Sequence, residues 1–488
     1  MDLHLDLSAA RGVSLARRME QALREAVVNG RLAPGERLPA TRALAAHLGI
    51  SRGVVAEAYA QLAAEGHLVT RRGGGTTVRA PAGTGLAARR AAEVHGSTYD
   101  SGAAAARAAG AAIVGPVRSR YDLRPGLPGL AGFPRRMWLA ALGRVLRELP
   151  DDRFGYADPA GVPELRLALA DYLGRVRGIR TKPDQIVVTA GVRQGATLLW
   201  SVLAASGARQ VAVEQPGWGG ARDTATAAGL VTVPVPVDGH GIAVDQLEGL
   251  DVDVDAVAVT PAHQFPTGAV LSAPRRAMLV AWAQRTGSVV LEDDYDAEFR
   301  YDRQPVGALQ GLAPELVVAA SSTSKTLAPA VRIGWLVLPQ RLVSSVRDRQ
   351  LTGSRGPSAL EQLALADLIR RGDYDRHLRR ARRAYHRQRD ALLAALAEAL
   401  PNLSIEGIAA GLHLLLRLPA NTDQASVVAA AYERGVALEG LAGNRPALVV
   451  GYANLHETAV RPAVAGLADA ITAASAASQR TAPGPPRG

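Results

Sequence analysis

The sequence of 488 residues contains no cysteine, which excludes disulfide bridges and metal sites built from thiolates. It also has no apolar run long enough to span a bilayer, and no charged-then-apolar signal segment at its start. We therefore expect a cytoplasmic protein without membrane contact. Lysine is almost absent as well: of 56 basic residues only Lys182 and Lys325 are lysine, and all others are arginine.

This scarcity makes Lys325 informative. A deprotonated lysine amine can form an imine with an aldehyde, whereas arginine cannot. A chain so rich in arginine would be expected to use arginine for a simple surface charge. Lys325 is therefore a candidate for holding an aldehyde cofactor.

Charge and length bound the class of protein. A net charge of +11 suits an anionic partner, with nucleic acid as the first candidate. One basic run, 370–390, has interleaved aspartates and is more typical of a solvated helix face than of a nucleic-acid contact. The length predicts more than one domain, and a hydrophobic content of 48% is enough for a buried core.

The sequence divides into four regions. Residues 12–79 combine short helical patterns with a Gly-rich hairpin, and 80–118 form an Ala/Gly-rich linker with few large apolar residues. Residues 119–475 alternate short Val/Ala-rich runs with helical patterns, and 476–488 form a tail that we expect to be disordered. Strands that alternate with helices predict an α/β fold with a mostly parallel sheet.

The first region predicts a helix-turn-helix. Residues 15–28 place an apolar residue every fourth position, as in an amphipathic helix. A second short helix ends at Gly49, and Ser51 can cap a third over 52–65. Two strands around a Gly-rich turn follow, at 67–80. In this arrangement the start of the second helix of the motif makes the base contacts, so Arg52 can reach guanine or phosphate.

The segment from Gly30 to Val78 resembles the winged helix-turn-helix of GntR-family transcription regulators over nearly the whole domain. The resemblance implies binding to double-stranded DNA. The residues that it implies as DNA contacts are Arg42, Ser51, Arg52, Gly53, Arg72 and Gly74. The alternative is a helical domain that serves as a protein-interaction module.

The third region offers what a pyridine aldehyde with a phosphate needs. Asp293 follows a buried strand, and an ionised aspartate beside a ring nitrogen favours the protonated ring. Tyr295 can hydrogen-bond the ring hydroxyl. Trp218 follows a Pro-Gly turn and can stack on the ring. Lys325 would supply the amine.

The phosphate needs hydroxyl groups, backbone N–H groups and a cation. Gly191, Val192 and Arg193 lie where a strand turns into a helix, whose N-terminus favours an anion. Ser322 and Ser324 flank the lysine, and Arg332 lies seven residues after it. Each of these residues is a weak signal by itself, but the set in this order is specific.

From 121 to about 455 the chain resembles fold-type-I aminotransferases, and together with the winged helix it resembles the MocR subfamily of GntR regulators. The resemblance implies a homodimeric regulator whose aminotransferase-like domain binds pyridoxal 5'-phosphate (PLP) and senses PLP or a small amine. It implies that Lys325 forms the imine with PLP, that Asp293 pairs with the ring nitrogen and that Tyr295 hydrogen-bonds the ring hydroxyl. Ser322 and Arg332, with 191–193, would hold the phosphate, and Trp218 would stack.

The sequence departs from the aminotransferase pattern in two places. The motif HQFPTG lacks the usual asparagine for the ring hydroxyl, so His263 or Gln264 has to replace it. The arginine that binds a substrate carboxylate is replaced by Val449, and Arg445 is offset from that position.

Three functions are consistent with these residues. The first is a PLP-dependent DNA-binding transcription regulator, and the second an active aminotransferase that also binds DNA. The third is a scaffold that dimerises the DNA-binding domains without a cofactor. The retained Lys325 and Asp293 argue against the scaffold, and Val449 argues against the aminotransferase. We therefore favour the regulator.

Overall fold

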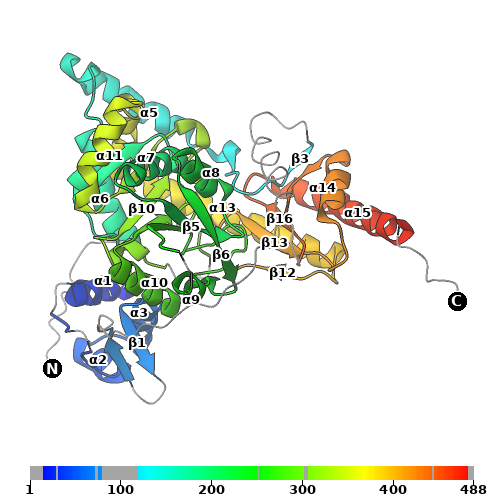
Figure 1. Cartoon of the computed structure of the whole chain (residues 1–488), viewed down its shortest axis with the longest axis horizontal. Helices are drawn as coiled ribbons and strands as arrows, with labels where there is room; N and C mark the ends of the chain where they lie inside the picture. The colour runs from blue at the N-terminus through cyan, green and yellow to red at the C-terminus, as the bar shows by residue number, and fades with distance from the viewer. Residues whose placement is uncertain are drawn as a thin grey trace.

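The computed structural model describes residues 15–28, 31–33, 35–71, 75–79, 119–250, 252–301, 306–441 and 445–481 (Figure 1). The expected linker 80–118 lies outside these residues. So do two of the expected DNA contacts, Arg72 and Gly74.

Residues 15–79, here called the head, fold as the sequence predicts. The head consists of α1 (Leu15–Val28), α2 (Thr41–Leu48), α3 (Arg52–Ala64) and the antiparallel strands β1 (Leu68–Arg71) and β2 (Gly75–Val78). Gly49 ends α2 in the left-handed conformation, with φ of 64°. The Ser51 hydroxyl caps α3 by accepting from the N–H of Val54 at 3.4 Å. Met19, Leu23, Val55 and Leu62 are fully buried between the helices.

An eight-stranded sheet organises the second part of the chain. Its order is β4-β11-β10-β9-β8-β5-β6-β7, and β11 and β7 run opposite to the others. The mostly parallel sheet expected from the sequence is therefore confirmed. The strands are β4 (Ile186–Thr189), β5 (Gln210–Gln215), β6 (Val231–Asp238), β7 (Gly241–Ile242), β8 (Ala256–Val259), β9 (Val289–Asp293), β10 (Val317–Ser322) and β11 (Gly334–Val337).

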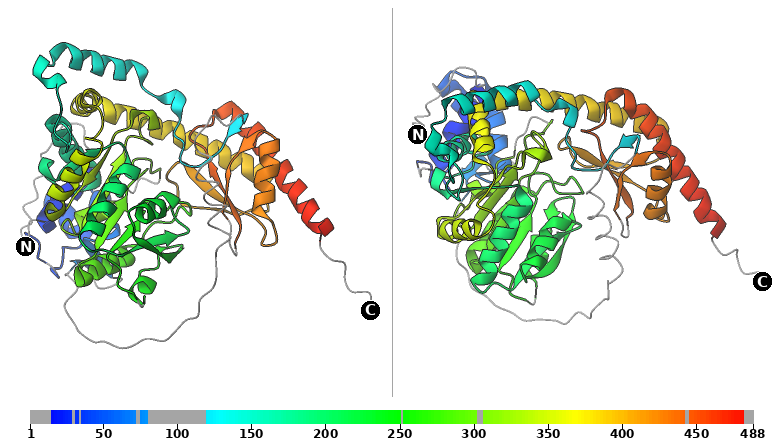
Figure 2. Two further views of the ribbon diagram at one scale, coloured as in Figure 1. Left: turned by 45° about the horizontal axis from the view of Figure 1, so that its top comes forward. Right: turned by 90° about the horizontal axis from the view of Figure 1, so that it is seen from above.

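Helices cover both faces of this sheet (Figures 1 and 2). On one face α7 (Val192–Ala205), α8 (Gly219–Ala227) and α11 (Gln340–Thr352) bury their apolar sides against the central strands. The other face packs against α9 (Val244–Glu248), α10 (Ala273–Thr286), α6 (Pro163–Arg177) and α12 (Ala359–Arg370). Because both faces are covered, the strands read as continuous apolar runs rather than as alternating ones.

The long helix α13 (Asp373–Ala399) leads from the large sheet to a smaller antiparallel one (Figure 2). The order of the smaller sheet is β12-β13-β16-β15, with bounds Ile405–Glu406, His413–Arg417, Ala447–Gly451 and Glu439–Leu441. The helices α14 (Gln424–Glu433) and α15 (Glu457–Thr481) cover one side. Near them β3 (Tyr121–Asp122) pairs with β14 (Val436–Ala437).

The helix α15 extends further than the sequence predicts. It continues through 476–481, which we expected to begin the disordered tail at 476–488. The reason is composition, since the alanines before the first Pro of the tail are strong helix formers. Residues 482–488 lie outside the described chain.

No helix within the described ranges is both long and apolar enough to cross a membrane.

Candidate PLP and DNA sites

The candidate cofactor residues gather at the carboxyl ends of the parallel strands, where open α/β sheets bind ligands. Trp218 follows β5, and Asp293 ends β9. Both line one cavity together with Glu214, Ala258 and Thr260. The ring of Trp218 folds back over Gly220, where an added Cβ would lie 2.1 Å from the ring. The cavity thus has a flat aromatic wall and a carboxyl group at the end of a buried strand.

Lys325 lies in the turn after β10. It is half-buried, and its Nζ donates to the carbonyl of Gly126. Burial lowers the pKa of Lys325, while the charges of Asp293, Asp296 and Glu439 oppose that shift. A lowered pKa increases the fraction of neutral amine, which is the form that attacks a carbonyl.

Asp293 fits a ring nitrogen. Its Oδ1 is buried and has no hydrogen-bond partner within the described chain. Burial, then the neighbouring charge of Asp294, raises the pKa of Asp293 to about 8, and Lys325 opposes the shift. A buried unpaired carboxylate is costly, so a protonated ring nitrogen would supply the donor that Oδ1 lacks.

Several residues expected to bind the phosphate lie around the start of α7. Gly191 has φ of 122°, and the guanidinium of Arg332 lies 3.7 Å from where its Cβ would be. The backbone of Arg332 itself adopts the left-handed conformation, with φ of 54°. Ser322 is buried at the end of β10, and its hydroxyl accepts from the N–H of Ser324 at 3.3 Å. The N-terminus of α7 and the guanidinium of Arg332 thus lie side by side, and both favour an anion.

The other two residues expected to bind the phosphate are placed differently. Val192 begins α7 and packs its side chain on the core, so it offers only its backbone N–H. The side chain of Arg193 is 57% exposed and pairs with Asp223 at 3.5 Å. Its guanidinium lies 5.6 Å from the centre of the Trp218 ring. Arg193 therefore adjoins Trp218, the residue that we expected to stack on the ring.

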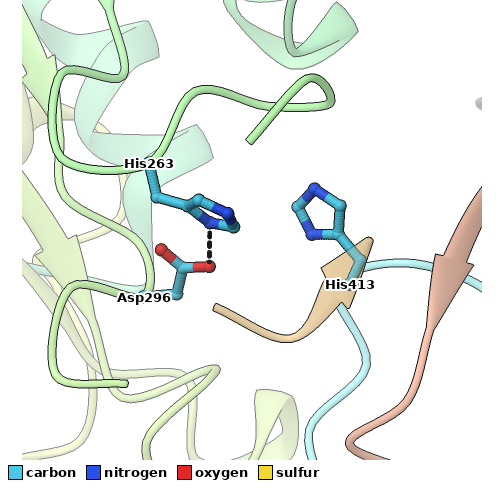
Figure 3. A group of neighbouring side chains, drawn as sticks. All are labelled: His263, Asp296 and His413. Carbon is cyan, nitrogen blue, oxygen red and sulfur yellow. Dashed lines mark hydrogen bonds and ion pairs between the residues drawn. The ribbon is translucent and has the colours of Figure 1, made fainter. Parts of the chain in front are cut away.

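The ring-hydroxyl candidate Tyr295 is half-buried and contacts a cluster of three buried polar side chains, His263, Asp296 and His413, which Figure 3 shows. Its hydroxyl lies 3.0 Å from Nδ1 of His263, and that nitrogen lies 2.9 Å from Oδ2 of Asp296. His413, from β13, faces the pair, with 5.1 Å between the two imidazole centres. Burial lowers the pKa of His413 to about 3, so this imidazole is neutral at physiological pH.

The side chain of Gln264 hydrogen-bonds to other protein groups rather than to Tyr295 or His263. Its amide donates to Glu214 Oε2 at 3.0 Å and to the carbonyl of Pro216 at 2.9 Å. Burial raises the pKa of Glu214 to about 7. Of the two residues expected to replace the asparagine, His263 is the one beside Tyr295.

Val449 and Arg445 are the residues that we expected at or near the position of the carboxylate-binding arginine. Val449 lies in the middle of β16, buried with Leu415 and Ala447. Arg445 is 72% exposed and pairs with Glu406 at 3.1 Å on the surface of the smaller sheet. Neither residue offers a cation to a substrate carboxylate.

Sequence reasoning missed Gly126, Glu214, Asp296 and His413. The last two come from segments more than a hundred residues apart, and a single histidine in an apolar strand is usually a core residue. Only the acidic run LEDDYD carried a signal, which pointed to Asp293 rather than to Asp296.

In the head, Arg42 and Arg52 are exposed at the first turns of α2 and α3. Gly53 is also exposed, and an added Cβ would meet only the Ser51 hydroxyl, at 3.8 Å. Four of the six expected DNA contacts thus lie on the exposed side of the helix-turn-helix.

Comparisons with known proteins agree with this architecture. Residues 15–78 match the family of bacterial regulatory proteins of the gntR type, and 132–469 match aminotransferase class I and II. The chain is 32% identical over 482 residues to the HTH-type pyridoxine biosynthesis transcriptional regulator PdxR of Corynebacterium glutamicum, covering 96% of this chain and 99% of that one. It is 31% identical over 474 residues to the probable rhizopine catabolism regulatory protein MocR of Rhizobium meliloti, covering 94% of each.

Solved structures share the fold of the second part. LysN, the α-aminoadipate aminotransferase of Thermus thermophilus, was solved with N-(5'-phosphopyridoxyl)-L-leucine and superposes with a TM-score of 0.67 at 24% identity. The superposition covers 73% of this chain and 93% of the LysN chain. The kynurenine aminotransferase of Pyrococcus horikoshii superposes with a TM-score of 0.67 at 23% identity. This superposition covers 78% of this chain and 95% of that enzyme. The chain therefore belongs to the MocR-type regulators of the GntR family, in which a helix-turn-helix head precedes a fold-type-I aminotransferase-like domain.

Proposed function

We propose that this protein is a DNA-binding transcription regulator whose aminotransferase-like domain binds PLP and responds to PLP or to a small amine. The observation that carries the proposal is the meeting of Lys325, Asp293 and Trp218 at one edge of the sheet. Lys325 and Asp293 are close enough for each charge to shift the pKa of the other. Since its DNA partner is the chromosome, the protein would act in the cytoplasm.

The residues divide into groups by the part of the cofactor that they would hold. Lys325 would bind the aldehyde carbon, and Asp293 the ring nitrogen. Trp218 would cover one face of the ring, and Tyr295 with His263 would hold the ring hydroxyl. PLP, when bound, supplies an electron-poor ring and a carbonyl that reacts with amines. The residues proposed for the phosphate are Gly191, Ser322, Ser324 and Arg332, together with the backbone N–H groups of Val192 and Arg193.

The proposed DNA contacts are the exposed residues at the start of the second helix of the motif. Arg52 would reach a base edge or a phosphate, and Arg42 would hold the backbone. Ser51 and Gly53 would approach through backbone and hydroxyl groups. Arg72 and Gly74 are proposed from the sequence alone. The segment 80–118 would link the head to the second domain.

A homodimer is the proposed assembly. Large apolar side chains are exposed along one stretch that includes α5 (Arg135–Glu148) and the segment after it. They are Leu139, Leu146, Phe154, Tyr156 and Leu167, and Leu139 is 72% and Tyr156 91% exposed. Large exposed apolar side chains concentrated in one stretch are candidates for a protein–protein interface. If a dimer forms here, Leu139→Asp with Leu146→Asp should halve the mass measured by light scattering. Val231→Asp, at an exposed apolar residue outside this stretch, should leave that mass unchanged.

The second candidate is an active aminotransferase that also binds DNA. Lys325 and Asp293 favour it, but Val449 offers no charge to an amino-acid carboxylate. An aminotransferase would convert the bound cofactor to its amine form when amino acids are added, and the absorbance spectrum would follow that conversion. We expect no such conversion on the timescale of catalytic turnover.

A DNA titration tests the regulator. The chain is titrated into DNA from its own upstream region, with and without PLP, and affinity is measured at fixed salt. We expect PLP, or PLP with an amine, to change that affinity. Specific DNA binding with no change in affinity under any of these conditions would contradict the proposed response.

A further inference from the structure

The head packs directly against the aminotransferase-like domain (Figure 1). The contact involves the C-terminal end of α3 and the loop 306–312, here called the docking loop. A Cβ on Gly307 would lie 3.1 Å from the side chain of Glu65, and a Cβ on Gly66 would lie 3.6 Å from Leu312. Arg24 of α1 lies against the backbone of Gly178, where a Cβ would be 3.4 Å from its Nε.

Buried charged groups lie on both sides of this contact. Glu65 is 4% exposed and accepts two hydrogen bonds from Arg24 Nη2, both at 2.8 Å. On the other side Arg276 is fully buried and donates to the carbonyl of Gly307 at 3.0 Å. Burial lowers the pKa of Arg276 to about 10, and Glu292 and Glu65 are among the charges that oppose the shift. Glu65 at the end of α3 is therefore near enough to Arg276, beneath the docking loop, to influence its pKa.

The docking loop is held by the strand that carries Asp293. Glu292 accepts from the N–H groups of Leu309 and Gln310, at 2.8 and 2.9 Å, within η4 (Leu309–Gly311). Glu292 and Asp293 are consecutive in β9, so their side chains leave on opposite faces of the sheet. One faces the candidate ring cavity, and the other holds the loop on which the head sits.

Asp294, on the other side of Asp293, holds the same loop. Its Oδ2 accepts from Nε of Arg177 at 2.7 Å, and both side chains are buried. Arg177 donates to the carbonyl of Val306, and its own carbonyl accepts from the N–H of Ala308 at 2.9 Å. The residues before and after Asp293 therefore anchor the docking loop at 306 and 308–310.

We propose that the head docks on the docking loop. We also propose that β9 couples the binding of PLP in the ring cavity to this docking. The coupling rests on the proposed function, because a ring nitrogen must engage Asp293. Any shift of Asp293 toward that nitrogen moves the end of β9, to which Glu292, Asp294 and the loop are attached. A ligand changes the docking equilibrium only to the extent that it binds the docked and undocked states differently.

The absence of cysteine allows a direct test. Leu312→Cys introduces a single thiol under Gly66, and Val231→Cys introduces one at a residue that is 63% exposed. The full-length chains are treated with N-ethylmaleimide, with and without PLP, and modification is followed by mass spectrometry. The absorbance of the same samples reports PLP binding independently.

We expect the thiol at position 312 to react at least tenfold more slowly than that at 231. We also expect PLP to change the rate at 312 at least threefold and to leave the rate at 231 unchanged. Gly307→Leu in the Leu312→Cys background should speed the reaction, because the new side chain would meet Glu65. Gly239→Leu, where an added Cβ meets nothing within 4 Å, is the matched control.

The outcomes separate the two claims. A PLP band with an unchanged rate at 312 would overturn the coupling and leave the proposed function intact. Equal rates at 312 and 231 would overturn the docking surface. No PLP band would contradict the proposed function and the coupling together. Hydrogen exchange of residues 61–68 in the unsubstituted chain, with and without PLP, gives the same readout without any substitution.

Discussion

Arg177 and Asp294 form an ion pair in which Nε and Oδ2 are 2.7 Å apart and both side chains are almost fully buried. Asp294 directly follows Asp293 in the sequence, and Arg177 hydrogen-bonds to Val306 and Ala308 of the docking loop. Nη2 of Arg177 and Oδ1 of Asp294 have no further hydrogen-bond partner among the described residues. The pair is thus incompletely satisfied, and each partner depends strongly on the other.

Removal of one partner should be severely destabilising. Asp294→Ala leaves the Arg177 guanidinium buried without its counter-charge, and such a change costs about 3–5 kcal/mol. Equilibrium unfolding in urea measures this loss. Glu248→Ala breaks an exposed pair with Arg285, at 3.0 Å, and should cost less than about 1 kcal/mol. The double variant Arg177→Met with Asp294→Leu should recover most of the loss, and a double variant as unstable as Asp294→Ala would contradict this view.

Asp293 should make the PLP-free protein less stable as pH rises. Its pKa is raised from 3.8 to about 8, so the native state retains a proton that the unfolded chain releases. The stability associated with the neutral carboxyl is fully present below pH 4 and is lost as pH rises toward 8. Asp293→Asn removes this dependence. Its free energy of unfolding relative to wild type should therefore increase between pH 5 and pH 8, by at least about 1 kcal/mol.

The comparison requires protein freed of PLP, because a bound ring nitrogen would pair with the carboxylate. A constant difference between the Asn variant and wild type across this pH range would show that Asp293 is not held neutral. In the presence of PLP the same variant should bind the cofactor at least about tenfold more weakly, because a charge-assisted hydrogen bond is lost.

Arg52 should contribute to DNA affinity. Arg52→Ala should weaken binding by about 1–3 kcal/mol if the side chain reads a base. If it contacts only a phosphate, the loss should be similar for all sequences, and the slope of log K against log salt should fall by about 1. Arg461→Ala removes the same charge from a residue that is 75% exposed on α15. Equal effects of the two substitutions would show that only net charge matters.

The large elements could be predicted because their signals are local. The end of α2 at Gly49, the cap at Ser51 and the apolar strand before Asp293 depend on neighbouring residues. The candidate role of Lys325 follows from the rarity of lysine in this chain. These features identified the helix-turn-helix, the mostly parallel sheet and the edge at which the candidate site lies.

The remainder depends on contacts between distant segments. His413 contacts His263 only because β13 of the smaller sheet lies beside the large one. The two residues are 150 positions apart in the sequence, so no local pattern predicts their contact. Glu65 meets Gly307 in the same way. The exposed position of Arg193 was also beyond prediction, because its contact with Asp223 depends on how α7 and α8 pack.

The most direct test of the central claim is the absorbance spectrum of the purified chain with added PLP, compared among wild type, Lys325→Ala and Lys182→Ala. Lys182 is the other lysine of the chain and is exposed, so it controls for the nonspecific reaction of PLP with surface amines. We predict a yellow absorbance band in wild type and Lys182→Ala that is absent from Lys325→Ala. A band that persists in Lys325→Ala, or one that is lost only in Lys182→Ala, would contradict the assignment of Lys325 as the cofactor lysine.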